Sequence, residues 1–327
     1  MQIFKNPNYN FVRWRWPAIA LSLVVIIAGA GVIATQGLKL GVEFEGGSIV
    51  IVRFAEPQPA LERVRSSLQA LPGNAGSDAV VQQYGDASQR QVMIRVTQVG
   101  AESGGSLSET ADAVEAALRA ANLGAFDVVG REIVGPVVGD QLKRQGTWAT
   151  VLALGGILIY LAVRFQLSFA VGAIAATIHD LAVTVAFLAF FQYDITLNVI
   201  AALLTITGYS VNDTIVIFDR VRENMRGMRR DNLEQIVNVA VNQTLGRTVI
   251  TAGTTFLSLL ALFLFGGEVL NGLAFTMLVG VVSGTYSTVF IAAAIAIMWQ
   301  GRKSLGGQAA AATPATTARK PTRRRVS

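Results

Sequence analysis

The sequence predicts an α-helical membrane protein with several spans and one α+β domain outside the bilayer. Of its 327 residues, 52% are hydrophobic and only 15% are charged, against roughly 25% charged in an average soluble domain. Six apolar segments are long enough to cross a hydrocarbon layer about 30 Å thick. One long stretch of mixed composition, residues 37–145, separates the first apolar segment from the second.

The six spans are predicted at residues 17–35, 147–163, 168–191, 197–218, 248–265 and 272–299. The first could instead be a signal peptide, since Lys5, Arg13 and Arg15 precede it. Its apolar run is longer than the roughly 7–15 residues of a signal h-region, and no clear cleavage site interrupts it. We therefore expect an uncleaved anchor, with residues 1–36 forming a cytoplasmic N-terminus and the first helix.

The basic residues predict the orientation, because they concentrate in cytoplasmic segments. With six spans and both termini inside, the cytoplasmic side holds Lys5, Arg13, Arg15, Arg164, Arg220, Arg222, Arg226, Arg229, Arg230 and the basic residues of 302–325. The opposite loops, 192–194 and 266–268, hold no basic residue. We expect a multi-pass protein of the cytoplasmic (inner) membrane. The net charge of +6 then reflects orientation, and no nucleic-acid partner is expected.

Residues 37–145 read as an extracytoplasmic ferredoxin-like domain. β-branched or alternating runs predict strands at 48–54, 79–84, 91–97 and 126–134, and helical spacing predicts helices at 59–71 and 106–121. The order β-α-β-β-α-β is that of the split βαβ arrangement. Many unrelated proteins share this fold, so the fold alone assigns no function.

The remaining chain, 146–299, holds spans two to six and one amphipathic cytoplasmic helix at about 231–242. Asp231 can cap this helix with Glu234 at N3, and its apolar residues follow helical spacing, so it should lie on the membrane surface or against the bundle. Residues 300–327, rich in Ala, Thr, Gly and Pro and then basic, are predicted to be a disordered cytoplasmic tail.

Two charged residues in the spans are candidate functional residues: Asp213 in span four and Arg247 at the cytoplasmic end of span five. Each costs about 2.5–3.5 kcal/mol to insert. They should lie at similar depth, where a pair about 4 Å apart gains about 4 kcal/mol at an effective dielectric constant of about 20. A permanent pair would be structural, and a pair that opens when Asp213 takes a proton would be a switch. The polar surroundings favour the switch.

Hydroxyl side chains extend this candidate proton pathway. Ser210 precedes Asp213 by three positions, and Thr251 follows Arg247 by four, so each shares a helix face with its charged neighbour. Such a stripe could line a wet path for protons. Equally, Ser and Thr often hydrogen-bond within or between membrane helices.

Asp180 and His179 in span three are a weaker pair of candidates. Adjacent helical positions point about 100° apart, so the two side chains need not form one site, and a relay or a packing role is open for both. Gly280 and Gly284 form a GxxxG pattern typical of close helix packing, with the partner helix undetermined.

Composition excludes several kinds of site. The chain has no cysteine and one histidine, which excludes thiolate zinc sites, a cysteine nucleophile and a multi-histidine metal site. It contains no Walker A pattern and no visible nucleophile–base constellation. We therefore expect no enzyme activity, metal or cofactor, with protons as the coupling ion.

The motifs that remain resemble the SecF family. They are residues 41–47 (GVEFEGG), 134–139 (VGPVVG), His179-Asp180, 208–224 (GYSVNDTIVIFDRVREN), 242–251 (NQTLGRTVIT) and 263–267 (FLFGG). The first two contribute Glu43, Phe44, Gly46, Gly47, Gly135, Pro136 and Gly139. The family usually has Asp where Glu43 stands and often Glu where Asp140 stands; both changes keep the charge. The resemblance covers about residues 10–300.

The resemblance implies a partner and a role. SecF proteins pair six spans with six of SecD in a pseudo-symmetric bundle of the RND superfamily, so this chain would supply half of it in membrane lipid. Asp213 and Arg247 match positions that the family uses for proton movement. The complex uses the proton gradient to help preproteins leave a SecY-type channel after the ATPase SecA has pushed them. The alternatives are a non-conducting scaffold that holds SecD at the channel, and half of an RND-type small-molecule exporter.

Overall fold

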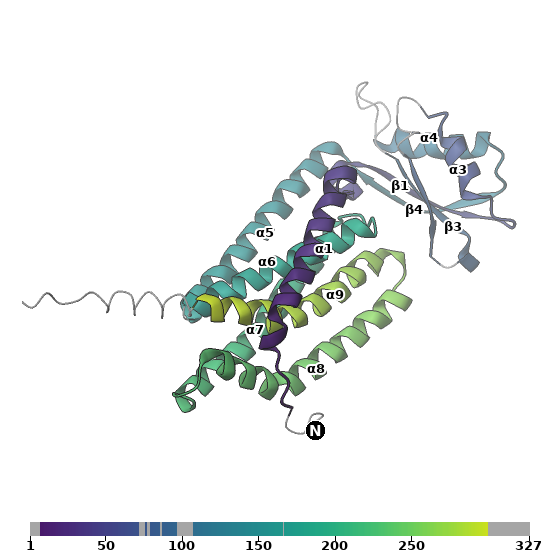
Figure 1. Ribbon diagram of the computed structural model, residues 1–327. Coiled ribbons are helices and arrows are strands. Elements are labelled where there is room, and N and C mark those ends of the chain that lie inside the picture. The colour runs from purple at the N-terminus through teal and green to yellow at the C-terminus, as the bar shows by residue number, and fades with distance from the viewer. Residues whose placement is uncertain are drawn as a thin grey trace, which may run out of the picture.

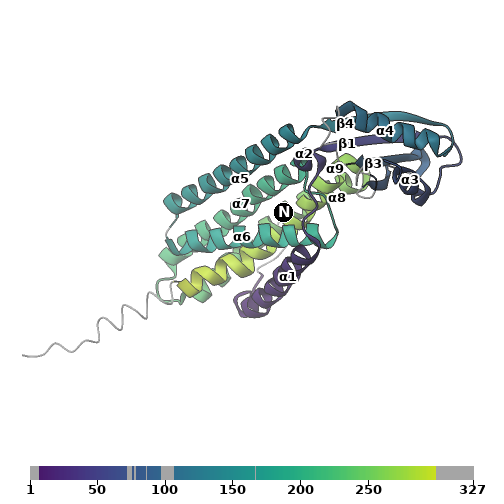
Figure 2. The same ribbon diagram turned by 90° about the horizontal axis from the view of Figure 1, so that it is seen from above.

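The computed structural model describes residues 7–71, 76, 79–85, 87–96, 107–165 and 167–299. The predicted disordered tail lies outside these residues. Within them, two parts are visible: a bundle of long helices and a small α/β body beyond one end of it (Figures 1 and 2).

Six helices are long and apolar enough to cross a membrane. They are α1 (Arg15–Gln36), α5 (Pro136–Arg164), α6 (Leu167–Phe190), α7 (Leu197–Gly227), α8 (Leu233–Phe265) and α9 (Glu268–Ser287). A 3₁₀ turn, Val12–Trp14, precedes α1, and a π-helical turn, Thr288–Ala292, extends α9 toward Trp299. The predicted number of spans is confirmed for the described residues. α5 begins well before the predicted position 147, because Pro136 occupies its first turn, where proline starts helices readily.

The six helices divide into an inner and an outer set. Between 44% and 61% of the apolar window of α6, α7 and α9 is buried within the chain, against 6–11% for α1, α5 and α8. The outer helices therefore present most of their apolar surface to whatever surrounds the chain.

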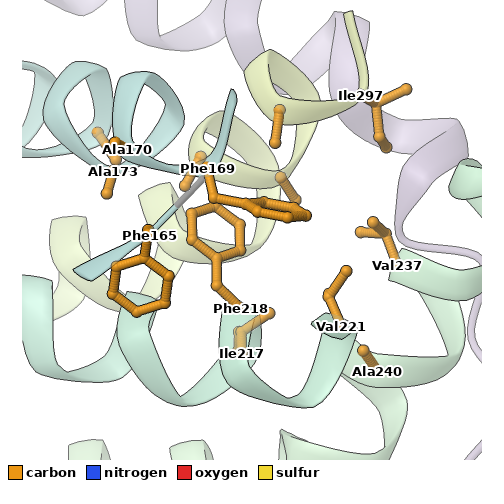
Figure 3. Close-up of a cluster of buried hydrophobic side chains, with 14 of the residues drawn as sticks. Phe165, Phe169, Ala170, Ala173, Ile217, Phe218, Val221, Val237, Ala240 and Ile297 are labelled. Atoms are coloured by element: carbon orange, nitrogen blue, oxygen red, sulfur yellow. The ribbon is translucent and has the colours of Figure 1, made fainter. Parts of the chain in front are cut away.

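At the end remote from the α/β body, phenylalanine side chains of α6 and α7 form the largest core (Figure 3). Phe169 packs on Phe218 with ring centroids 5.0 Å apart. The first turns of α8 add Val237 and Ala240, which are fully buried. The amphipathic segment predicted at 231–242 thus packs against the bundle, and the structure joins it without a break to the fifth span. Its N-cap is Asn232 rather than Asp231, with the Asn232 side chain accepting from the Gln235 N–H at 2.8 Å.

The α/β body is one antiparallel sheet with helices on one face. Its strands are β1 (Gly47–Phe54), β2 (Val80–Tyr84), β3 (Gln91–Val96) and β4 (Phe126–Val134), in the order β2-β3-β1-β4. The helices α3 (Leu61–Leu68) and α4 (Leu107–Ala120) lie between strands in the chain, and a 3₁₀ turn, Ala87–Gln89, links β2 to β3. The observed order of elements is the predicted β-α-β-β-α-β.

Alternation along β1 explains which face is covered. Val50 and Val52 are fully buried and pack with α3 and α4, whereas Ile49 and Ile51 between them are only partly buried. Successive strand residues face opposite sides of a sheet. The second face is therefore left without a helix and is turned toward the bundle.

Candidate functional site

Asp213 lies in the middle of α7 and is half-buried. The Thr248 hydroxyl of α8 donates to its Oδ1 at 3.0 Å. Its Oδ2 is buried and has no hydrogen-bond partner among the described residues. A carboxylate normally satisfies both oxygens when it leaves water. This one keeps an open position for a proton, a water molecule or a group from another chain.

Pairing of Asp213 with Arg247, which the sequence left open, is not seen among the described residues. Among the residues that the structure describes, no ion pair joins them, and Arg247 is exposed on α8. The reason is helical geometry: Arg247 and Thr248 are neighbours about 100° apart, and Thr248 is the one that faces α7. A sequence gives the position of each charge along its helix, but not the side of the helix that the charge faces.

The hydroxyl stripe of α8 continues on the same exposed face. Thr251 donates to the backbone carbonyls of Arg247 at 2.9 Å and Thr248 at 3.2 Å. Ser258, also exposed, donates to the carbonyl of Thr254. These hydroxyls hydrogen-bond to backbone carbonyls of their own helix, which agrees with a structural role for Ser and Thr in membrane helices. They lie on a surface that none of the other described helices covers.

Ser210, which we predicted to accompany Asp213, contacts Asp180 instead. Its hydroxyl donates to Asp180 Oδ2 at 2.5 Å. Ser287 donates to the same oxygen at 2.7 Å, and Ser283 to Oδ1 at 2.8 Å. His179 Nδ1 lies 3.1 Å from Oδ1, so the two neighbours do form one site.

The two serines of α9 in this cluster were not predicted as partners of a carboxylate. Ser283 and Ser287 are four residues apart and so share one helix face, which is the signal that could have identified them.

The helix that packs against the GxxxG pattern of Gly280 and Gly284 is α7. A Cβ at Gly280 would lie 2.1 Å from Ile206 Cδ1, and one at Gly284 would lie 3.0 Å from Ser210 Cβ, so α9 packs closely on α7.

Two of the sequence motifs meet where the α/β body joins the bundle. They come together between the short helix α2 (Val42–Glu45), whose Phe44 is buried, and the start of α5. A Cβ at Gly139 would lie 3.2 Å from the Phe44 carbonyl oxygen and 3.3 Å from the Gly46 nitrogen. Gly46 and Gly47 have φ of 76° and 137°, conformations that favour glycine. Gly135 is the N-cap residue of α5, with Pro136 in its first turn.

The loop between α6 and α7 completes this joint. The Gly41 N–H donates to the Ile195 carbonyl at 2.8 Å, and the Ile195 N–H donates to the Lys39 carbonyl at 2.7 Å. Arg95 of β3 forms a 3.0 Å ion pair with Asp194 of the loop. The Arg95–Asp194 pair was not foreseen, because no local pattern connects residues so far apart in the chain.

A cleft of about 500 Å³ lies at the joint, between the uncovered face of the sheet and the α6–α7 loop. Glu43 and Glu132 both line it. Burial, and then repulsion by the Glu43 carboxylate, raise the pKa of Glu132 above its ordinary value.

Comparison with known proteins gives consistent matches along the chain. The family described as "Protein export membrane protein SecD/SecF, C-terminal" matches residues 113–302, and the "SecD/SecF GG Motif" family matches residues 31–58. The protein translocase subunit SecF of Pseudomonas aeruginosa is 41% identical over 293 residues, covering 90% of this chain and 92% of that one. SecF of Magnetococcus marinus is 41% identical over 317 residues, covering 96% and 100%.

Solved structures agree. The crystal structure of SecDF from Thermus thermophilus, a translocon-associated membrane protein, matches with a TM-score of 0.79 at 35% identity over 91% of this chain. SecDF in a super-membrane-facing form matches with a TM-score of 0.68 at 34% identity over 94%. The chain spans about two fifths of each SecDF chain, 39% and 41%.

Six apolar helices, two motifs that meet at one joint and relatives of nearly equal length all lead to the same assignment. This multi-pass membrane protein belongs to the SecF family of protein translocase subunits.

Proposed function

We propose that the chain is the SecF-type half of a SecD–SecF complex, which uses the proton-motive force to promote late preprotein translocation. The complex would act beside a SecY-type channel, on preproteins that the ATPase SecA has pushed across. Protons are its coupling ion, and no other cofactor is required. The observation that carries the proposal is Asp213, a carboxylate inside a span with one open oxygen.

The distribution of buried surface supports a partner that supplies the second half of the helical bundle. The exposed hydroxyl stripe of α8 and Arg247 share one face with no cover from this chain, next to α7 and Asp213. The matched SecDF chains are much longer than this one. SecD spans against this face would bring their own polar groups to Asp213, and lipid would cover the remaining apolar surface of α1 and α5.

The proton pathway we propose consists of Asp213, Arg247 and Thr251. Thr248 holds Asp213 Oδ1, which leaves Oδ2 to accept a proton. Arg247 adjoins Thr248 at the level of Asp213, and Thr251 lies about one turn farther along α8, away from the basic end of the bundle. One charge crossing the membrane yields about 2.3 kcal/mol per 100 mV, enough to shift a two-state equilibrium more than tenfold and too little to unfold a preprotein in one stroke.

The orientation we propose follows the basic residues. Arg15, Arg164 and Arg222 lie at the helix ends remote from the sheet, where they pair with Glu234 and Asp219. Placing this end in the cytoplasm satisfies the positive-inside rule. The sheet, whose strand order is that of a ferredoxin-like domain, then lies outside the inner membrane, where emerging preproteins are found.

The proposal is tested by Asp213→Asn, which keeps the shape and removes the titrating group. We expect the variant to fold and to co-purify with SecD, and to lose the export that depends on the proton gradient. Thr248→Val, which removes the donor to Asp213, should weaken export partially. Thr276→Val is the matched control, because the Thr276 hydroxyl bonds to the Gly272 carbonyl of its own helix, α9, and lies away from the exposed face of α8.

The outcome that contradicts the mechanism is normal gradient-dependent export by Asp213→Asn in cells without the wild-type chain. If, in addition, Arg247→Gln exports normally and deletion of residues 37–145 abolishes export, the chain is a scaffold. Loss of SecD from the purified Asp213→Asn complex would assign Asp213 to assembly, and would also contradict the mechanism.

A further inference from the structure

Asp180 is the most completely satisfied ionisable side chain described in the spans. It is 1% exposed, and four polar side chains surround its two oxygens. Oδ2 accepts from Ser210 at 2.5 Å and Ser287 at 2.7 Å, Oδ1 accepts from Ser283 at 2.8 Å, and His179 Nδ1 lies 3.1 Å from Oδ1. A carboxylate has about four acceptor sites, so none is left for a further partner.

This arrangement is the opposite of that at Asp213. Ser210, Ser283 and Ser287 are themselves 0–6% exposed, so the cluster is buried within the chain. Asp213, in contrast, is half-buried, and its Oδ2 has no partner among the described residues. Of the two carboxylates, only Asp213 has an oxygen without a hydrogen-bond partner among the described residues.

The donors of Asp180 come from three helices. His179 and Asp180 are on α6, Ser210 is on α7, and Ser283 and Ser287 are on α9. These are the three inner helices of the bundle. The cluster therefore joins α7, which carries Asp213, to both of its inner neighbours at a single point.

The backbone around the cluster is built for close approach. Gly284 lies between the two serines of α9, and a Cβ there would come within 3.0 Å of Ser210. The π-helical turn begins at Thr288, directly after Ser287, and the Thr288 hydroxyl lies 3.1 Å from that of Thr214 on α7. π turns often occur at functional positions. Here Ser287 contacts Asp180 of α6, while the next residue, Thr288, contacts α7.

Ser210 precedes Asp213 by three residues, about one turn and about 4.5 Å along α7. A shift or rotation of α7 at Ser210 must therefore move Asp213 relative to Thr248. We propose that Asp180 is a positioning residue: its hydroxyl cluster fixes α7 in the register that places Asp213, and Asp180 itself carries no proton. This inference rests on the proposed function, because it assigns Asp213 as the proton-binding group.

The test uses the complete SecD-containing complex in membrane vesicles and measures gradient-driven export of a reporter preprotein against pH. The variants are Asp180→Asn, Ser210→Ala, Ser283→Ala and Ser287→Ala. Thr285→Ala is the matched control on α9, since the Thr285 hydroxyl bonds only to the Val281 carbonyl of its own helix. Among the described residues, His179 is the only titratable side chain bonded to Asp180.

We expect each cluster variant to lower export by about 2- to 10-fold, the effect of one lost hydrogen bond, and to shift the pH of half-maximal export. Asp180→Asn should be tolerated in this range. The Ser287 hydroxyl lies 3.2 Å from the Gly284 carbonyl, so it can donate there and accept from the new amide. Thr285→Ala should behave as wild type.

A second measurement reports the position of α7 without any export assay. The chain has no native cysteine, so Thr214→Cys with Thr288→Cys gives one disulfide between α7 and α9 under a membrane-permeant oxidant. The cluster variants should slow its formation, and Thr285→Ala should not. This measurement judges the cluster even if Asp213→Asn exports normally and the proposed function fails.

Three results would overturn the inference. The first is a folded, SecD-bound Asp180→Asn complex without gradient-driven export while the three serine variants export normally, which would make Asp180 a proton carrier. The second is a wild-type pH profile in every cluster variant. The third is an unchanged rate of Thr214→Cys–Thr288→Cys disulfide formation in every cluster variant, which would show that the cluster does not set the position of α7.

Discussion

At the residue scale, Glu43 and Glu132, the two carboxylates that line the cleft at the joint, lead to a pH prediction. The pKa of Glu132 is raised by burial and then by Glu43, so its charged form is less favourable in the folded protein than in the unfolded chain. Its charge therefore costs stability at neutral pH. The cost disappears as the pH falls through the raised pKa toward the ordinary value of 4.5.

We expect Glu132→Gln to raise the unfolding temperature at pH 7.5 by about 1–2 °C, taking roughly 0.5 kcal/mol for the partly screened cost of burying its charge near Glu43. The gain should shrink toward zero near pH 4.5. Thermal unfolding of the purified protein at a series of pH values checks this. Asp127→Asn is the control, an exposed carboxylate at the other end of β4. A gain that is constant with pH would show that shape, not charge, is responsible.

At the element scale, the approach of α9 to α7 depends on Gly280. A Cβ there would lie 2.1 Å from Ile206 Cδ1, and Ile206 is 1% exposed, so it has little room to move. Overpacking of this kind costs about 1–3 kcal/mol. We expect Gly280→Ala to lower the unfolding temperature and the yield of folded protein.

The compensating change is Ile206→Ala, which removes Cδ1, Cγ1 and Cγ2, the three atoms that would clash. Gly280→Ala should cost less stability in the Ile206→Ala background than in the wild-type protein, and the difference is measured as a coupling free energy in a double-mutant cycle. Gly253→Ala on α8 is the control, because a Cβ there meets nothing within 4 Å. If the two changes in the free energy of unfolding simply add, the side chains at positions 280 and 206 do not contact each other.

Elements were easier to predict from the sequence than their contacts. The spans and the β-α-β-β-α-β order follow from apolar length and residue periodicity, which are local properties. The partner of Ser210 is not a local property. Asp213 lies on the same helix, α7, and Asp180 lies on α6, and only the rotation of α7 against α6 decides which of the two Ser210 contacts. The same holds for Arg247, whose neighbour Thr248 faces Asp213. The rotation of a helix about its axis depends on how its side chains pack against neighbouring helices, as at Gly280 and Ile206. This packing cannot be predicted from a single sequence.

At the scale of the whole molecule, the α/β body is fixed to the bundle at three places. Two are the chain connections at α1 and α5 (Figure 1). The third is the α6–α7 loop, bound through Gly41, Ile195 and the Arg95–Asp194 ion pair. Three attachments, with Gly139 packed against Phe44 and Gly46, leave little freedom at the joint. The α/β body and the outer ends of the helices should therefore move as one unit during export.

A disulfide at the joint tests this rigidity. Leu40 and Ile195 form a parallel β-bridge, and paired strands lie about 5 Å apart, within the Cα separation of roughly 4.4–6.8 Å that a disulfide spans. Leu40→Cys with Ile195→Cys should oxidise readily, and the oxidised protein should export reporter preprotein as well as the reduced one. Each single cysteine variant, treated with the same oxidant, is the control. Loss of export on oxidation, restored by a reductant, would mean that the joint opens in every cycle and that the Arg95–Asp194 pair is a latch.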